Sequence, residues 1–95
     1  MAGLDQHLQA PARLKLMALA AAATEVEFAV LRDHLEVSDS VLSKHITTLA
    51  DAGYVKSRKG NQEGRRTTWV AATAKGRKVL SGHVAALRAI IEDVV

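Results

Sequence analysis

The stretch that decides the fold is VSDSVLSKHITTLADAGYV, residues 37–55. Ser38 is a good helix N-cap, three apolar residues then recur at helical spacing, and Gly53 predicts a left-handed helix end. The apolar residues are Leu42, Ile46 and Leu49. If they are buried, the opposite side presents short polar groups and a single charge instead of the usual Glu and Lys, so we expect a polar partner there. These outward residues are Ser40, Ser43, Lys44 and Thr47.

Two more helices are predicted before this stretch. Pro11 separates a short helical piece over residues 4–9 from a helix over residues 11–23, because the residue before a proline avoids helical conformation while proline suits the first turn. A very short strand at residues 24–26 leads to a second helix that ends near Leu35. The predicted apolar face of the first helix consists of Leu14, Met17, Ala18 and Ala21.

The period of the pattern changes after Gly53. Residues 54–59 and 67–72 are rich in strand formers and enclose a polar tip, residues 60–64, which predicts a β-hairpin with a long loop. Thr73 then caps a helix that runs close to the C-terminus. The predicted fold is mainly α with a small β-hairpin (α+β).

Length and composition agree with one folded domain. A chain of 95 residues, 48% of them hydrophobic, can bury a small core, so we assign residues 1–95 to a single domain. The absence of cysteine excludes disulfides and thiolate chemistry. The longest apolar run, residues 17–23, is far too short to cross a membrane. We expect a cytoplasmic protein without a membrane partner.

Charge is unevenly distributed along the chain. Residues 40–78 contain nine basic and two acidic side chains, whereas the remainder has a net charge of −4 within a total of +3. One electropositive face is therefore expected, as for a partner with many phosphates. The alternative is that the basic residues only solubilise the hairpin.

Together these features resemble the winged helix-turn-helix of MarR-like and ArsR-like transcriptional regulators. The resemblance covers most of the chain, and it also includes TAKGR, residues 73–77, and the opening LDQHLQAPARLKLMALA, residues 4–20. One departure is Glu36, in a turn where such proteins often have glycine because φ tends to be positive. The residues of the first stretch that carry the resemblance are Ser38, Ser43, His45, Ile46, Leu49, Ala52 and Gly53.

The resemblance implies a helix-turn-helix at about residues 28–52 and a wing at about residues 54–72. The third helix would enter the major groove of double-stranded DNA, and the wing would reach the backbone or the minor groove. His45 would either contact a phosphate or pack against the second helix. Asp39 lies in the first helical turn, where the helix dipole stabilises a carboxylate, so we expect it to stabilise the helix and not to contact a base. The candidate DNA-binding residues are Ser38, Ser40, Ser43, Lys44, His45, Thr47, Arg58, Lys59, Asn61, Gln62, Arg65 and Arg66.

The last helix, at about residues 74–94, repeats apolar residues at spacings of 4, 3, 4 and 3, the seam of a coiled coil. Pairing with a second copy would bury this seam and place two recognition helices about 34 Å apart on one DNA face. The alternative is that the helix folds back on its own domain. The candidate dimer-interface residues are Leu4, Leu8, Leu80, Val84, Leu87, Ile91 and Val94.

Catalysis finds little support in the sequence. Ser43 and His45 are two residues apart and do not face each other on a helix, and no phosphate-binding loop or zinc spacing is present. We expect no enzyme activity, no cofactor and no bound metal. The prediction is a homodimeric DNA-binding regulator, a repressor that occludes a promoter, with an unidentified small-molecule effector left open. The rival is a protein-interaction module whose basic wing meets an acidic partner.

Overall fold

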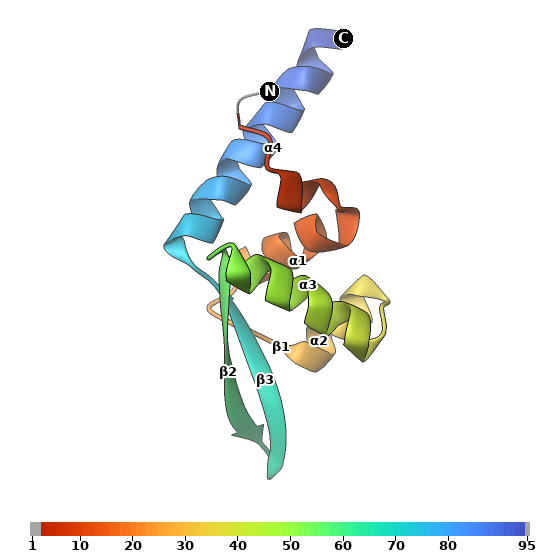
Figure 1. The fold of residues 1–95 in the computed structure, drawn as a ribbon, viewed down its shortest axis with the longest axis vertical. Helices are drawn as coiled ribbons and strands as arrows, with labels where there is room; N and C mark the ends of the chain where they lie inside the picture. The colour runs from red at the N-terminus through yellow and green to blue at the C-terminus, as the bar shows by residue number, and fades with distance from the viewer. Residues whose placement is uncertain (1–2, 95) are drawn as a thin grey trace.

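The computed structural model describes residues 3–94. The molecule is elongated, 51 × 25 × 20 Å, because one long helix leaves the body at one end and a β-hairpin leaves it at the other (Figure 1). This arrangement confirms the predicted mainly α fold with a small hairpin. Its elements are a 3₁₀ helix η1 (Gln6–Gln9), α1 (Pro11–Ala21), β1 (Val26–Glu27), α2 (Phe28–Leu35), α3 (Asp39–Asp51), β2 (Val55–Gln62), β3 (Arg65–Ala72) and α4 (Ala74–Val94).

Helix α1 begins at Pro11, as predicted, but its predicted apolar face is wrong in part. Met17 is buried, whereas Ala18 is exposed, and Leu16 and Ala20 are buried in its place. The reason is tertiary: η1, α2, α4 and β3 all pack against α1, so its neighbours and not its local apolar pattern decide which side is covered.

The turn between α2 and α3 keeps the geometry expected of a helix-turn-helix. Glu36 has φ 54° and ψ 45°, the left-handed conformation that glycine would adopt without cost. The Val37 N–H donates to the Arg32 carbonyl oxygen at 3.4 Å, which closes the end of α2. Ser38 then caps α3, as predicted, because its hydroxyl accepts the Val41 N–H at 3.2 Å.

The strands form a three-stranded antiparallel sheet in the order β1-β3-β2. Pairing in the hairpin continues to Gln62 and Arg65, so only Glu63 and Gly64 make the turn, with φ of 53° and 79°. The predicted five-residue tip is therefore wrong: Asn61 and Gln62 lie on β2 and not in a loop. A two-residue turn with positive φ at both positions matches the twist of the paired strands, which lets them extend further.

The core lies where α1, α2, α3 and the base of the sheet meet, and Leu8 from η1 closes one side of it. Leu8 is 0% exposed. It is consequently unavailable to a second copy of the chain, and its assignment to a dimer interface is wrong. Other fully buried side chains are Leu16, Met17, Leu31, Leu42, Leu49 and Val70.

The TAKGR segment joins three parts of the fold at the start of α4. The Thr73 hydroxyl donates to the Gly53 carbonyl oxygen at 2.6 Å and accepts the Gly76 N–H at 3.0 Å, so Thr73 is the predicted cap. Gly76 packs so closely that a Cβ there would lie 2.0 Å from the Tyr54 carbonyl oxygen. Arg77 donates to the carbonyl oxygen of Ala21 at 2.6 Å and so closes the open end of α1.

A buried polar network fastens the N-terminal segment to α4. The Asp5 N–H donates to Nδ1 of His83 at 2.9 Å, and His83 is 1% exposed. The Tyr54 hydroxyl donates to the Asp5 carboxylate, and this hydrogen bond raises the pKa of Tyr54 to about 12. The network thereby connects α4 to the residue that precedes the wing.

The two ends of helix α4 have different surroundings. Toward the body it buries Gly76, His83 and Ala86, so the helix does fold back on its own domain over its first part. The far end of α4 extends beyond the body (Figure 1). Near this end, Ile91 is 62% and Val94 is 84% exposed. Within residues 3–94, no helix combines the length and apolar character needed to span a bilayer.

Candidate nucleic-acid interface

Helix α3 presents a polar outer surface, as predicted. Its three apolar anchors are buried, which fixes the rotation of the helix about its axis. The four polar residues expected to point outward are all exposed: Ser40, Ser43, Lys44 and Thr47. Short hydroxyls on this surface permit a close approach of the helix backbone to another molecule.

The first turn of α3 contains an ion pair that the sequence analysis missed. Arg32 on α2 donates to the Asp39 carboxylate at 3.2 Å and also contacts Asp33. Hydrogen bonding to Asp39, and then to Asp33, raises the pKa of Arg32. The negative charge of Asp39, which would repel phosphates, is therefore balanced from the neighbouring helix.

The four basic residues of the wing that are candidate DNA contacts divide between the two faces of the hairpin. Cross-strand pairing opposes Lys59 to Thr68 and Arg66 to Asn61, and alternation along the strands places Lys59 and Arg66 on one face. The same alternation places Arg58 and Arg65 on the other face. The sequence alone did not separate these pairs, because the pairing register of β2 and β3 depends on the length of the turn between them.

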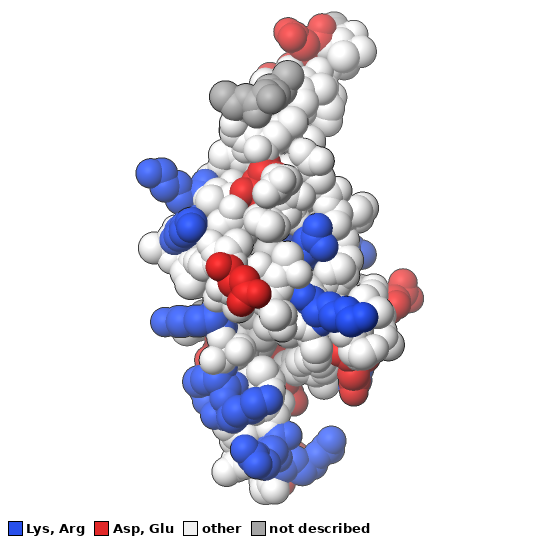
Figure 2. Space-filling model, in the orientation of Figure 1, with Lys and Arg blue, Asp and Glu red and all other residues white. Residues whose placement is uncertain are grey.

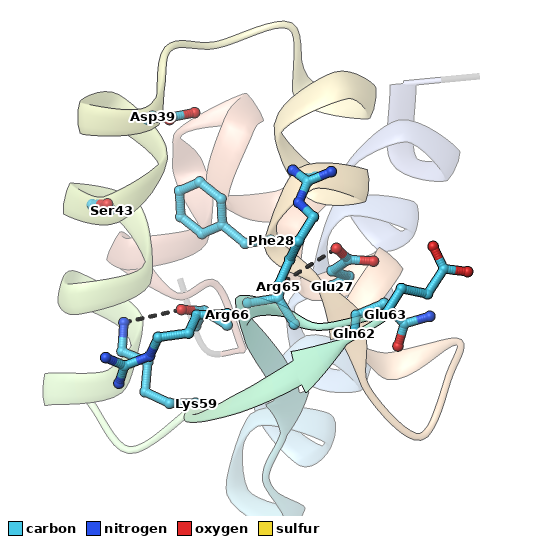
Figure 3. Close-up of a pocket in the computed structure, with 12 residues that line it drawn as sticks. Glu27, Phe28, Asp39, Ser43, Lys59, Gln62, Glu63, Arg65 and Arg66 are labelled. Atoms are coloured by element: carbon cyan, nitrogen blue, oxygen red, sulfur yellow. Dashed lines mark hydrogen bonds between the residues drawn. The ribbon is translucent and has the colours of Figure 1, made fainter.

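A hollow of about 690 Å³ lies between α3 and the wing (Figure 3). Ser43 and Asp39 line it from α3, Phe28 from the start of α2, and Lys59 and Arg66 from the wing. Within the hollow Lys59 also donates to the Thr68 hydroxyl at 3.0 Å. The remaining lining residues are Glu27, Ala29, Gln62, Glu63, Arg65, Thr67 and Thr68.

Glu27 on β1 also lines this hollow, and its carboxylate has a hydrogen-bond partner. The Thr67 hydroxyl donates to its carboxylate at 3.2 Å. Neither Glu27 nor Thr67 was singled out in the sequence, since the register that places β1 beside β3 joins segments about 40 residues apart. The hollow thus combines three cations of the wing with hydroxyls and with two hydrogen-bonded carboxylates, those of Glu27 and Asp39, while Glu63 lines it at the turn.

Arg58 stands apart from the other wing cations. Its guanidinium forms a two-point ion pair with Glu25, one bond of which spans 3.0 Å, and it lies 5.5 Å from the ring centroid of Trp69. Hydrogen bonding to Arg58 lowers the pKa of Glu25. In the free protein Arg58 therefore holds the wing to the segment before β1 and packs over Trp69.

His45 is half-buried on the flank of α3. Burial, and then the nearby charge of Arg13, lower its pKa, so the neutral imidazole is favoured. Both sequence-based alternatives for this residue, a phosphate contact and packing at the boundary, remain predictions.

Two further basic residues of segment 40–78 make contacts within the protein. Arg77 is bound to carbonyl oxygens at the end of α1, and the Lys75 ammonium lies 5.7 Å from the centre of the Tyr54 ring. The space-filling view shows basic side chains gathered along the wing, while acidic ones lie over the body and at the far end of α4 (Figure 2). Of the basic residues counted in the sequence, Arg58 and Arg77 are thus bound within the protein, whereas Lys59, Arg65 and Arg66 line the hollow.

Comparison with known proteins identifies the class. Residues 12–91 match the family model described as a winged helix DNA-binding domain, and the chain belongs to this family. An uncharacterized protein of Methanocaldococcus jannaschii is 31% identical over 72 residues, which cover 76% of this chain and 78% of that protein.

Solved structures agree on the fold. A transcriptional regulator homologue from Pyrococcus horikoshii superposes with a TM-score of 0.87 at 26% identity, over 95% of this chain and 89% of that one. A zinc-responsive MarR family member from Lactococcus lactis, ZitR, gives a TM-score of 0.65 at 19% identity, over 88% of this chain and 57% of that one. FabT of Streptococcus pneumoniae, solved in complex with DNA, gives 0.65 at 19%, over 86% and 57%. The predicted likeness to MarR-like winged-helix regulators is thereby confirmed.

Proposed function

We propose that this protein is a transcriptional regulator that binds specific sequences of double-stranded DNA. In the proposed complex α3 lies in the major groove, and the wing lies against the adjacent backbone and minor groove. The observation that carries the proposal is the hollow between α3 and the wing. A sugar-phosphate strand separates the two grooves of a duplex, and it would occupy this hollow when both elements are engaged.

The residues then divide by role. Bases would be read by hydroxyl and ammonium groups of α3, and phosphates would be neutralised by the wing. Asn61 and Gln62, which lie on β2 next to the turn, would reach the minor groove. Ser38 is already used as the cap, so its contribution to DNA would be indirect. The proposed base-reading residues are Ser40, Ser43, Lys44 and Thr47, and the proposed phosphate contacts are Lys59, Arg65 and Arg66.

We further propose that two copies pair through α4. A groove of about 490 Å³ runs along this helix, and its lining includes Leu80, Val84 and Ala85, flanked by Arg88 and Glu92. A second α4 fits this surface, because the opposite charges of Arg88 and Glu92 would meet across a two-fold axis while the apolar residues are covered. Leu4, Leu87, Ile91 and Val94 extend the same proposed interface. A dimer bound over a promoter would act as a repressor by occlusion.

The test is a salt titration of binding to duplex DNA. Affinity should fall steeply, with a log-log slope of about −0.9 for each phosphate neutralised. Binding to single-stranded DNA of the same sequence serves as the control and should be weaker. A flat salt response, or equal affinity for both forms, would exclude a duplex-binding role and favour the interaction-module alternative.

A further inference from the structure

Within residues 3–94, one apolar side chain of α3 is exposed, that of Val41. Val41 is 40% exposed in the first turn of the helix, within the polar surface that includes Ser40 and Lys44. Valine has a lower helix propensity than polar residues such as Glu, Lys or Gln, so its presence at an exposed helical position does not improve folding. A single exposed valine is ordinary on a protein surface, and its position is what gives it meaning here.

That position is the end of the helix nearest to the bases in the proposed complex. Side chains of a helix lean toward its N-terminus, so Val41 covers the first turn of α3. Lys44 and His45, three and four residues further on, are its neighbours along the same flank. Ser43 lies on the other flank, where it lines the hollow beside the wing.

We infer that Val41 reads a thymine by contact with its 5-methyl group. The inference rests on the proposed function. In the major groove the thymine methyl is the apolar feature of the four standard bases, and small aliphatic groups recognise it by contact. The hydroxyls and the ammonium group around Val41 supply hydrogen bonds to neighbouring positions, whereas an isopropyl group can form none. Val41 would thus restrict one position of the operator to a T·A pair.

The test begins with selection of duplexes from a random synthetic pool by the wild-type protein. Each thymine of the selected site is then replaced by deoxyuridine, which removes only the methyl group. At one position the affinity of the wild type should fall about fourfold, the scale of one buried methyl or methylene group. The Val41→Ser variant should bind the two duplexes equally, and Val41→Thr, which keeps one methyl, should retain part of the difference.

Val30→Ser is the matched control, because Val30 is 43% exposed on α2 and should leave the uracil effect unchanged. Thermal unfolding of each variant verifies that it is folded. Uracil that is neutral at every position, or an equal loss for wild type and Val41→Ser, would overturn the inference while leaving the proposed function in place. A protein that selects no duplex at all would overturn the proposed function, and this inference with it.

Discussion

Arg58 on β2 is paired with Glu25, 33 residues earlier in the chain, so one cation of the wing is already neutralised in the free protein. Arg66, on the other face of the hairpin, lines the hollow beside α3. These two arginines of the wing therefore differ in their availability to phosphate.

The first prediction concerns this difference. Arg66→Ala should weaken binding to all duplex sequences alike and reduce the magnitude of the salt slope by about 1. Arg58→Ala should change the slope less, because its charge is balanced by Glu25 before DNA arrives. Salt titrations of both variants measure the difference, and equal changes in slope would contradict it.

The second prediction concerns the start of α4. Gly76→Ala should destabilise the fold by about 3 kcal/mol or more, the upper range for overpacking, because the new Cβ would overlap a backbone oxygen. Gly82→Ala is the control on the same helix: its nearest neighbour would be 3.9 Å away, and the variant should be more stable by up to about 1 kcal/mol. Urea unfolding measures both, and similar stabilities for the two variants would refute the close contact.

The third prediction follows from the hydrogen bond between Tyr54 and Asp5. The folded-state pKa of Tyr54, about 12, lies above its ordinary value of 10.0, so the native state holds the proton more tightly. This contribution to stability is complete below pH 10 and is lost as the pH rises toward 12. Tyr54 is the single tyrosine of the chain, so tyrosinate absorbance reports it directly. Titration at the ordinary value, or an unchanged pH profile in Tyr54→Phe, would argue against the bond.

The fourth prediction separates the two roles of His45. A phosphate placed beside the imidazole stabilises its protonated form, so its lowered pKa should rise when DNA binds. NMR titration with and without duplex gives the answer. Arg13→Gln is the internal check, since loss of that charge should raise the pKa of His45 in the free protein. No response to DNA would assign His45 to packing.

The fifth prediction tests the proposed pairing of α4. Ile91→Asp should yield monomers in sedimentation, because the aspartate would be buried against a second copy. Val30→Asp places the same charge on another exposed aliphatic position, on α2, and should leave the association state unchanged. A dimer that survives Ile91→Asp would locate the interface elsewhere.

Local signals in the sequence predicted the elements well. Ser38, Gly53 and Thr73 act through hydrogen bonds and backbone angles within a few residues, and each has the expected conformation or bond. The length of the hairpin was not predictable in the same way, because Glu63 adopts a positive φ that its residue type does not favour.

Features that depend on distant segments were missed. The partner of Arg58 lies in another part of the chain, and Leu8, assigned to a dimer interface, is instead buried in the core of its own domain by the packing of η1. The exposed polar side of α3, which we propose faces DNA, was accessible to sequence reasoning because burial of its three apolar anchors determines it. The hollow could not be predicted from the sequence, because it lies between α3 and the wing, and tertiary packing sets their relative position.

The anchoring of α4 has a geometric consequence. Arg77 fixes its first turn to the end of α1, and His83 fixes its middle to the N-terminal segment. With 21 residues, α4 is about 31 Å long at the usual helical rise. In the proposed dimer, α4 would act as a rigid spacer. The point along α4 at which two copies cross would set the distance between their α3 helices. This distance would in turn set the number of base pairs between half-sites.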